Sequence, residues 1–504
     1  MHSGKKLSFV SGLSVEYESR VFYPTKPPGP LSCVKKMVTV EEFRVESDTM
    51  GEVKVPGSAY YGATTVRGIE NFPISGLRFQ KGFIESLALV KLAAAKANMQ
   101  LGLLDKKKGE AIVSAAKEVM EGSLYDQFVL DVFQTGSGTM TNMNMNEVIA
   151  NRAIELLGGR RGDKKLVHPN DHVNMCQSTN DVFPTAIHVS AAQAIERKLI
   201  PSLRILADVL GKKAREFEDV VKAGRTHLQD AVPVTLGQEF SGYASMIRHG
   251  LKRAEAARDA LLELPLGGTA VGTGLNADPQ YAESAVKEIN RLTGLNFRKA
   301  ENTFESMQGK DACVEASGQL KTIAASLMKI TNDLRLLNSG PRTGFGEIDM
   351  PATEPGSSIM PGKVNPVIPE ALNLVAAQVI GNDAAIAVCG ALGQLELNIM
   401  MPVIAYDLLQ SVEILANGSK VLAEKCVAGI TADRKRCLEY ADRSLMVVTA
   451  TTPHIGYDNA ARVAKKAISE NKSIRQVILE EKILPKEKLD AVLDLKKMTK
   501  GGRA

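Results

Sequence analysis

Four short stretches of the sequence gather the residue types that do chemistry, namely serine, threonine, asparagine, histidine and lysine. They are "QTGSGTMTNMNMNE" at 134–147, "VHPNDHVNMCQSTND" at 167–181, "AGRTHLQDAVP" at 223–233 and "GSSIMPGKVNP" at 356–366. Each precedes or joins a helical segment, and loops on a rigid scaffold are where binding and catalysis concentrate. Helix capping by Ser, Thr and Asn accounts for one such loop. It accounts less well for four loops that also contain histidines and a lysine.

The fourth stretch predicts a site for an anion. Asn365 followed by Pro366 is typical of a helix start, with Asn as the N-cap and Pro at the first helical position. The positive end of that helix would face the loop, and such ends bind carboxylates and phosphates. Lys363 would add a positive charge, while Gly356 and Gly362 allow tight backbone turns. We therefore predict a mobile, anion-binding lid that carries two hydroxyls.

Other classes of site fit these residues less well. Pro169 lies between His168 and His172 and breaks any helix that would present both, and neither HExxH nor a cysteine partner is present, so we predict no metal site. A nucleophilic triad is disfavoured because no GxSxG elbow follows a strand. The glycines of "LGGTAVGTG" at 266–274 lack the preceding strand and the lysine of a phosphate loop, and they predict a turn of close backbone approach instead.

The scaffold that must position these loops is predicted to be all-α. Aromatic residues make up only 5% of the 504 residues, which fits a core of Ala, Leu, Val and Ile. Residues 85–104 favour a helix by propensity, and residues 370–415 carry so few charges that we predict a helix buried inside a large bundle, partly by other subunits. Strand patterns are confined to the start, as in "EVKVP" at 52–56. Leucines at helical spacing predict two further helix faces: Leu199, Leu203, Leu206 and Leu210, and Leu320, Leu327 and Leu334.

Bulk properties exclude several classes of partner. The net charge of +5 comes without a long Lys/Arg block, so we expect no nucleic acid. No uninterrupted apolar run approaches the ~18–20 residues that span a bilayer, so we expect no membrane. Six widely spaced cysteines without a CxxC pair suit reduced thiols inside a cell.

Residues 1–40 are predicted to be an N-terminal extension. They are a poor secretory signal, and prolines and a glycine at 27–30 form a linker. Three explanations stay open: an upstream segment before Met37 that is not needed, a disordered tail, or an organellar presequence, which Glu16 and Glu18 disfavour. A cytoplasmic location is accordingly preferred over a mitochondrial one.

Together the four stretches resemble the aspartase/fumarase superfamily and, within it, the class II fumarate hydratases. "GSSIMPGKVNP" is the superfamily signature almost letter for letter, and the resemblance covers about residues 41–504. It implies a three-domain helical subunit and a homotetramer whose active sites each draw on three subunits. We place the domains at 41–176 (N-terminal helical), 177–430 (central long-helix bundle) and 431–504 (small, helical and lysine-rich).

The resemblance also implies the reaction, which is reversible hydration of fumarate to L-malate in the tricarboxylic acid cycle without a cofactor. Removing a proton beside a carboxylate creates a doubly charged aci-carboxylate, which cations and N–H donors must stabilise. Ser357 matches the family's base, and Lys363 with Asn365 matches its anchor for that charge. His227 matches the histidine that handles water, and Glu370 matches the carboxylate that orients it.

Further positions match the family's binding residues. Those for the substrate carboxylates are Ser137, Thr139, Ser178, Thr179, Asn180, Thr226 and Asn365. Those for a secondary dicarboxylate site are His168, Asn170 and Asp171.

The alternative within the superfamily is aspartate ammonia-lyase. The lyase usually has glutamine where this chain has His227, and it lacks the "TGSGT" form of the first loop, so both features favour the hydratase. "VIPE" at 367–370 is closer to the lyase pattern, and Thr179 replaces a serine found in many fumarases. A catalytically silent structural member would be expected to have lost Ser357, Lys363 or His227, and all three are present.

Overall fold

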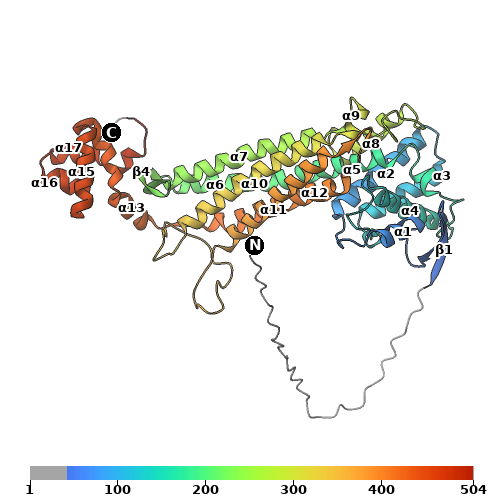
Figure 1. Cartoon of the computed structure of the whole chain (residues 1–504), viewed down its shortest axis with the longest axis horizontal. Helices are drawn as coiled ribbons and strands as arrows, with labels where there is room; N and C mark the ends of the chain where they lie inside the picture. Colours follow the sequence, from blue (N-terminus) through green and yellow to red (C-terminus); the bar gives the residue numbers. More distant parts are fainter. Residues whose placement is uncertain (1–41, 503–504) are drawn as a thin grey trace, which may run out of the picture. The chain divides into compact units, whose positions relative to one another are not determined.

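The computed structural model describes residues 42–502, so the predicted extension at 1–40 lies outside the described residues. The described chain is mainly helical, as predicted, and its strands form five separate two-stranded sheets (Figure 1). Long helices pack along one another, and the irregular polar loops lie at their ends.

The N-terminal part begins with a hairpin. Strand β1 (Phe43–Asp48) pairs antiparallel with β2 (Gly51–Pro56), which confirms the strand predicted at 52–56. The predicted helix at 85–104 is α2 (Lys81–Gln100), and it stops before Gly102, whose φ is 74°. The other elements here are α1 (Ala63–Asn71), α3 (Lys106–Met120), η1 (Tyr125–Gln127), α4 (Thr139–Leu156) and the π-helical turn η2 (Pro169–Val173).

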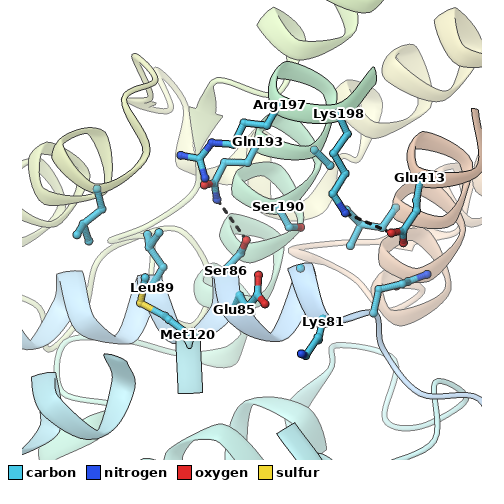
Figure 2. A pocket seen from close by; sticks show the side chains of 15 residues that line it. Lys81, Glu85, Ser86, Leu89, Met120, Ser190, Gln193, Arg197, Lys198 and Glu413 are labelled. Carbon is cyan, nitrogen blue, oxygen red and sulfur yellow. Dashed lines mark hydrogen bonds and ion pairs between the residues drawn. The ribbon is translucent and has the colours of Figure 1, made fainter. Parts of the chain in front are cut away.

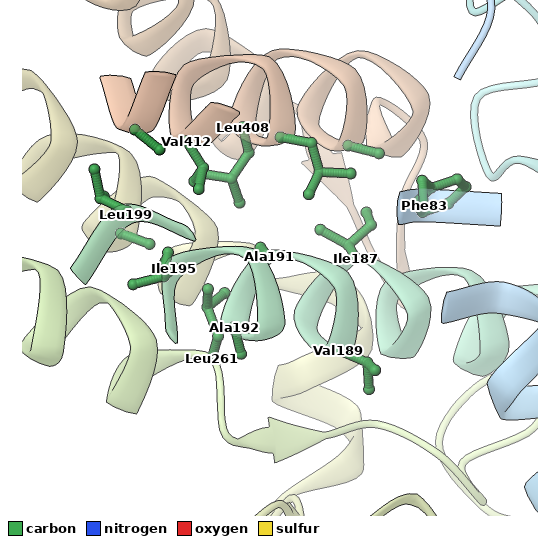
Figure 3. Packing of buried hydrophobic residues seen from close by; sticks show 14 of the residues in the cluster. Phe83, Ile187, Val189, Ala191, Ala192, Ile195, Leu199, Leu261, Leu408 and Val412 are labelled. Atoms are coloured by element: carbon green, nitrogen blue, oxygen red, sulfur yellow. The ribbon is translucent and has the colours of Figure 1, made fainter. Parts of the chain in front are cut away.

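The central part is a bundle of long helices. Its elements before residue 338 are α5 (Thr179–Ala194), the π-helical turn η3 (Ile195–Leu199), α6 (Ile200–Glu216), α7 (Leu236–Ala260), α8 (Tyr281–Thr293), α9 (Thr303–Gln308) and α10 (Asp311–Leu337). Both predicted leucine faces are fully buried, on η3–α6 and on α10. Figure 3 shows Ile195 and Leu199 of η3 in the same apolar cluster as Leu408 and Val412 of α12 (Met401–Lys425).

The prediction of one helix over 370–415 is wrong. Helix α11 (Val367–Ala391) ends at a small hairpin, β8 (Gly393–Gln394) with β9 (Leu397–Asn398), and α12 follows. Leu395, in the turn between β8 and β9, has φ 50°, a left-handed conformation that no regular helix contains. By length and composition α11 could also cross a membrane, yet it packs against α10 and α12. Only 33% of its most apolar window is buried within this one chain.

A second hairpin was not predicted, since strands were expected only near the start. Strand β3 (Val221–Thr226) pairs antiparallel with β4 (Gln229–Thr235). His227 and Leu228 form the two-residue turn, with φ of 54° and 59°. Turns with two positive φ values match the twist of the strands they join, but they normally carry Asn or Gly. The usual hairpin pattern was therefore missing from the sequence.

The remaining short strands are β5 (Glu263–Leu264), parallel to β6 (Arg298–Lys299), and β7 (Ile348–Asp349), antiparallel to β10 (Thr431–Ala432). The C-terminal helices are η4 (Val427–Gly429), α13 (Arg434–Arg443), η5 (Leu445–Thr451), α14 (Thr452–Ile455), α15 (Tyr457–Glu470), α16 (Ile474–Glu480), α17 (Lys486–Val492) and α18 (Leu495–Met498). Residues 447–493 form their own apolar cluster around Val463, Val477 and Leu489. The domain limits at 41–176, 177–430 and 431–504 stay predictions.

Candidate active site

The first polar loop ends at the N-terminus of α4. Gly138 is the N-cap with φ 81°, and a Cβ there would approach the Phe183 ring to 2.3 Å, so the position requires glycine. Ser137 is buried, and its Oγ lies 2.8 Å from Thr139 Oγ1. Two predicted binding hydroxyls therefore stand side by side at a positive helix end.

The second loop ends in a capping box at the start of α5. Ser178 Oγ accepts from the Asn180 amide at 3.3 Å, and the Ser178 amide donates to Asp181 Oδ1 at 2.9 Å. Thr179 Oγ1 accepts from Asn142 Nδ2 of α4 at 2.8 Å. This bond joins α4 to α5, so the structure brings the first two loops together.

The glycine-rich loop at 266–274 packs on the same helix start. The amides of Gly267 and Thr269 each donate to Asp181 Oδ2 at 3.0 Å, and Asn180 Nδ2 donates to the Ala270 carbonyl at 2.8 Å. The loop thus serves a buried carboxylate, and the predicted turn of close approach is confirmed. Burial raises the pKa of Asp181 to about 6, although its three amide donors act in the opposite direction.

The "HPND" stretch forms the turn η2, with His168 as its cap. His168 Nδ1 accepts from the amides of Asn170 at 3.1 Å and Asp171 at 3.2 Å. An accepting Nδ1 carries no proton, so the ring proton is on Nε2. The Asp171 carboxylate, 3.5 Å from Nδ1, consequently makes no ion pair with this neutral ring. Asn170 and Asp171 are exposed to solvent.

The third loop projects its residues from a rigid base. Thr226 and His227 are exposed at the turn between β3 and β4. Below them, Arg225 Nη1 contacts both oxygens of the fully buried Glu347 at 3.1 and 3.0 Å, and Lys222 Nζ lies 3.3 Å from the same carboxylate. This buried ionic cluster fixes the strand that presents His227.

The fourth loop closes on itself through side chain and backbone. Ser357 Oγ accepts from the amides of Ile359 at 3.2 Å and Met360 at 3.0 Å. Asn365 Nδ2 donates to the Gly356 carbonyl at 2.7 Å. Helix α11 begins at Val367 with Pro366 as its N-cap. The predicted roles of Asn365 as N-cap and Pro366 as first helical residue are therefore wrong, because the Asn365 amide closes the lid instead.

Beside the lid lies a cavity of about 630 Å³ lined in part by Lys363, Asn365 and Glu370. Arg335 Nη2 lies 3.9 Å from Glu370 Oε1, and both side chains are about half exposed. His227, the predicted partner of Glu370, does not line this cavity.

Within this one chain, the second and third loops lie far apart. Helices α5 and α6 are joined without a break by η3, so residues 179–216 form one helical run. At about 1.5 Å per residue the run is about 57 Å long. Thr179 starts it, and His227 follows its far end. Within residues 42–502, no hydrogen bond or ion pair joins the hairpin turn or the lid to the first two loops.

Another cavity, of about 520 Å³, lies between α2, α5 and α12 (Figure 2). Its Lys198 pairs with Glu413 at 3.2 Å, and its Gln193 donates to Ser86 Oγ at 3.4 Å. None of the predicted site residues lines it. Across the described part of the chain, no group of three or more His, Cys, Asp or Glu side chains is placed to hold a metal ion.

Sequence reasoning missed the polar side chains behind the first two loops. Asn142 contacts Thr179 directly, and Asp181 organises the start of α5. The pattern "STND" at 178–181 is a capping box that could have indicated Asp181. The alternating asparagines of "TNMNMNE" could have indicated Asn142, because amides that recur inside a buried helix need polar partners.

Comparisons with known proteins identify the family of this chain. Residues 51–381 match the model of a lyase family, and residues 447–500 match the fumarase C C-terminus. A class II fumarate hydratase of Nitrosomonas europaea is 54% identical over 460 residues, covering 91% of this chain and 100% of the relative. The chain belongs to the class II fumarase family.

The fumarase fold is found in solved structures as well. A class II fumarase from Schistosoma mansoni superposes with a TM-score of 0.89 at 42% identity, covering 91% of this chain and 99% of that one. An aspartate ammonia-lyase of Bacillus subtilis is 48% identical over 464 residues, covering 92% and 98% of the two chains. Two reactions thus occur among similar proteins, and the choice between them rests on the site residues of this fumarase-family chain.

Proposed function

We propose that the chain catalyses the reversible hydration of fumarate to L-malate. The observation that carries the proposal is that a class II fumarate hydratase is 54% identical to this chain and is covered along its whole length. His227, at the tip of the β3–β4 hairpin, supports the hydratase over the lyase because its imidazole can give a proton to a departing hydroxyl or take one from water.

In the dehydration direction, Ser357 takes the proton from the carbon beside one carboxylate of malate. The electron pair of that C–H bond moves into the carboxylate and gives the aci-carboxylate. The electron pair then returns to form the carbon–carbon double bond of fumarate as the C–O bond of the neighbouring carbon breaks, and the hydroxyl leaves as water with a proton from His227. Hydration reverses these steps. The amides of Ile359 and Met360, which already donate to Ser357 Oγ, would stabilise the alkoxide that this role requires.

The charge of the intermediate needs preorganised donors. Lys363 supplies a cation, and the start of α11 supplies the positive end of a helix dipole. Asn365 uses one amide hydrogen to close the lid and keeps a second for the substrate. Glu370 would orient His227. The remaining proposed contacts to the substrate carboxylates are Ser137, Thr139, Ser178, Thr179, Asn180 and Thr226.

We further propose a homotetramer in which three subunits supply one site. The length of the run at 179–216 supports this, since His227 can meet Thr179 only if they come from different subunits. The exposed apolar face of α11 supports it too: Leu374 is 74% and Val388 60% exposed in one chain. Such a face requires a protein partner.

Two finer proposals complete the assignment. His168, Asn170 and Asp171 would form a secondary dicarboxylate site, to which His168 offers its Nε2–H. A cytoplasmic location fits the cysteines of residues 42–502, all five of which are free thiols.

The test follows the ultraviolet absorbance of fumarate with purified protein, with and without ammonium. We expect fumarate to be consumed in buffer alone and malate to accumulate. Turnover that appears only with ammonium would overturn the proposal in favour of aspartate ammonia-lyase, which "VIPE" at 367–370 and the 48% identical relative favour. It would also remove the role given to His227.

A further inference from the structure

A buried lysine lies behind the second loop, outside the proposed catalytic and binding residues. Lys91 of α2 is completely buried. Its Nζ donates to Asn174 Oδ1 at 2.8 Å and to Gln177 Oε1 at 3.0 Å. Both acceptors belong to the segment that leads into Ser178 and Thr179. A buried ammonium paired with amides rather than carboxylates is costly, so its presence needs a reason.

The bonds around Lys91 run in one direction only. An amine held by two acceptors donates to both, and even the neutral amine has two N–H groups for them. The carbonyl ends of Asn174 and Gln177 must therefore face Lys91. The other end of Gln177 agrees, because its Nε2 donates to the carbonyls of Val173 and Met175.

The orientation of Asn174 in turn fixes the hydrogen bonds of Thr179, the proposed substrate contact. Asn174 Oδ1 also accepts from Asn142 Nδ2 at 3.3 Å and from Asn146 Nδ2 at 3.2 Å. The amide nitrogen of Asn142 is thereby turned toward Thr179, whose Oγ1 it reaches at 2.8 Å. Because Thr179 Oγ1 already accepts, its own hydrogen is left to donate. Within residues 42–502, no protein acceptor contacts that hydrogen.

The same contacts hold a strained turn. Cys176, which precedes Gln177, has φ 61°, a conformation that costs a non-glycine residue free energy. The Gln177 side chain donates back across Cys176 to the carbonyls of Val173 and Met175, and Lys91 anchors Gln177. Burial lowers the pKa of Lys91 to about 7, while the charge of Asp181 acts in the opposite direction.

We propose that Lys91 is a positioning residue for dicarboxylate binding. Through Asn174 and Asn142 it fixes the Thr179 hydroxyl as a hydrogen-bond donor to a substrate carboxylate. This proposal rests on the proposed function, since Thr179 is given its substrate there. Lys91 touches no reacting atom, so it should affect how tightly substrate binds more than how fast it reacts.

The experiment is a double-mutant cycle on the full-length enzyme, with fumarate hydration and succinate binding by calorimetry as readouts. Thr179→Val should raise KM and the Kd for succinate by roughly ten- to a hundredfold, the range for a lost hydrogen bond to a charged group. Lys91→Met should raise both by roughly tenfold and change kcat less than threefold. In the double variant, the loss should equal that of Thr179→Val alone, because both changes remove the same donor.

Matched variants separate positioning from general stability. Lys310 is also a buried lysine, but it donates only to the carbonyls of Ser306, Met307 and Gly309. Lys310→Met should leave KM unchanged, and Lys91→Arg should restore KM because guanidinium is also donor-only. If Lys91→Met does not fold, Lys91→Gln replaces it, since glutamine fills the space without fixing the direction of the bonds.

Two outcomes overturn the inference while the enzyme still hydrates fumarate. The first is that Lys91→Met has a KM no higher than that of Lys310→Met. The second is that the double variant raises KM by the product of the increases caused by Lys91→Met and Thr179→Val alone. A wild-type protein that neither hydrates fumarate nor binds succinate overturns the proposed function together with it.

Discussion

The four polar loops are held in two different ways. Residues 134–139 and 167–181, which we call the anchored half, are fixed from behind by buried amides, a lysine and the carboxylate of Asp181. Residues 226–228 and 356–366, the projecting half, are largely exposed: Leu228 is 64% and Ile359 83% accessible. The anchored half is thus shaped inside one chain, whereas the projecting half holds its proposed reactive side chains with little protein around them.

The difference teaches how such a site can combine rigidity with movement. Carboxylate recognition needs donors at fixed positions, which a buried network supplies. Proton transfer needs exclusion of water only while substrate is bound, which a lid can supply on closing. The proposed function places the base on the projecting half and most carboxylate contacts on the anchored half, and this division separates the two requirements.

The largest effect is expected from removing the base in the projecting half. Ser357→Ala should lower kcat by about 10²–10⁴-fold, the usual contribution of a positioned proton-transfer group. Its oligomeric state and helix content should stay unchanged, because Ser357 is bonded only within the lid. Steady-state kinetics with sedimentation and circular dichroism measure both. Near-normal turnover would remove Ser357 as the base.

The next effect concerns the surface that should unite the two halves. Val388→Glu on α11 should dissociate the proposed tetramer and abolish most activity, since a charge buried in an apolar interface is strongly unfavourable. Ile468→Glu on α15 is the matched control, because Ile468 is also an exposed apolar residue, at 65%. Sedimentation velocity distinguishes the two variants. A fully active Val388→Glu monomer would contradict the shared site.

Mixing experiments test directly whether the halves come from different chains. Ser357→Ala and Thr179→Val subunits, unfolded together and refolded in equal amounts, should regain about one quarter of the wild-type activity at low fumarate. One quarter is expected because a site is intact only when its Ser357 comes from a Thr179→Val subunit and its Thr179 comes from a Ser357→Ala subunit. Each of these has a probability of about one half. Activity that stays at the mean of the two variants would place both residues in one subunit.

The smallest effect is on stability and reports on the interior of the anchored half. The unfolded chain keeps the Lys91 proton up to its ordinary pKa of 10.5, whereas the folded chain loses it near 7. Between these values the unfolded state binds more protons, so folded stability rises with pH. For Asp181, whose pKa is raised from 3.8 to about 6, stability falls as pH rises through that window.

The Lys91 part is measured by urea unfolding of wild type and Lys91→Met at pH 7 and pH 10. The unfolding free energy of wild type should gain a few kcal/mol relative to the variant, since one pKa unit corresponds to about 1.4 kcal/mol. If the unfolding free energies of wild type and Lys91→Met change equally between pH 7 and pH 10, the Lys91 side chain is not desolvated in the folded protein.

Much of the scaffold could be predicted from the sequence, because buried leucines at helical spacing report one face directly, as on α6 and α10. The hairpin carrying His227 could not, because its turn uses histidine and leucine where asparagine and glycine are usual. The break between α11 and α12 was missed although the sequence carries a signal for it. Residues 394–399, "QLELNI", alternate polar and apolar side chains, a pattern that favours a strand over a helix.

The candidate residues were predicted through family resemblance, and their local surroundings were not. Nothing in the spacing of Asn365 shows that its amide bonds Gly356 rather than capping α11. Lys91 lies in an Ala/Leu-rich helix, where one lysine suggests a solvated edge. Its partners are 83 and 86 residues away, and contacts at that range depend on the fold.

The π-helical turn η3 has a consequence for what this chain can tolerate. It lies inside the run at 179–216, which sets the distance between Thr179, a proposed carboxylate contact, and the hairpin that carries His227. Deleting one residue there would convert η3 to an ordinary α turn and nearly keep the phase of the helix beyond it, because a π turn holds about one residue more than an α turn. Deleting one residue from α5 or α6 would instead rotate everything beyond the deletion by about 100°. His227 would then swing to another side of the bundle. In the proposed tetramer, the phase of a helix far from the substrate would therefore decide whether a neighbouring subunit receives His227 in a usable position.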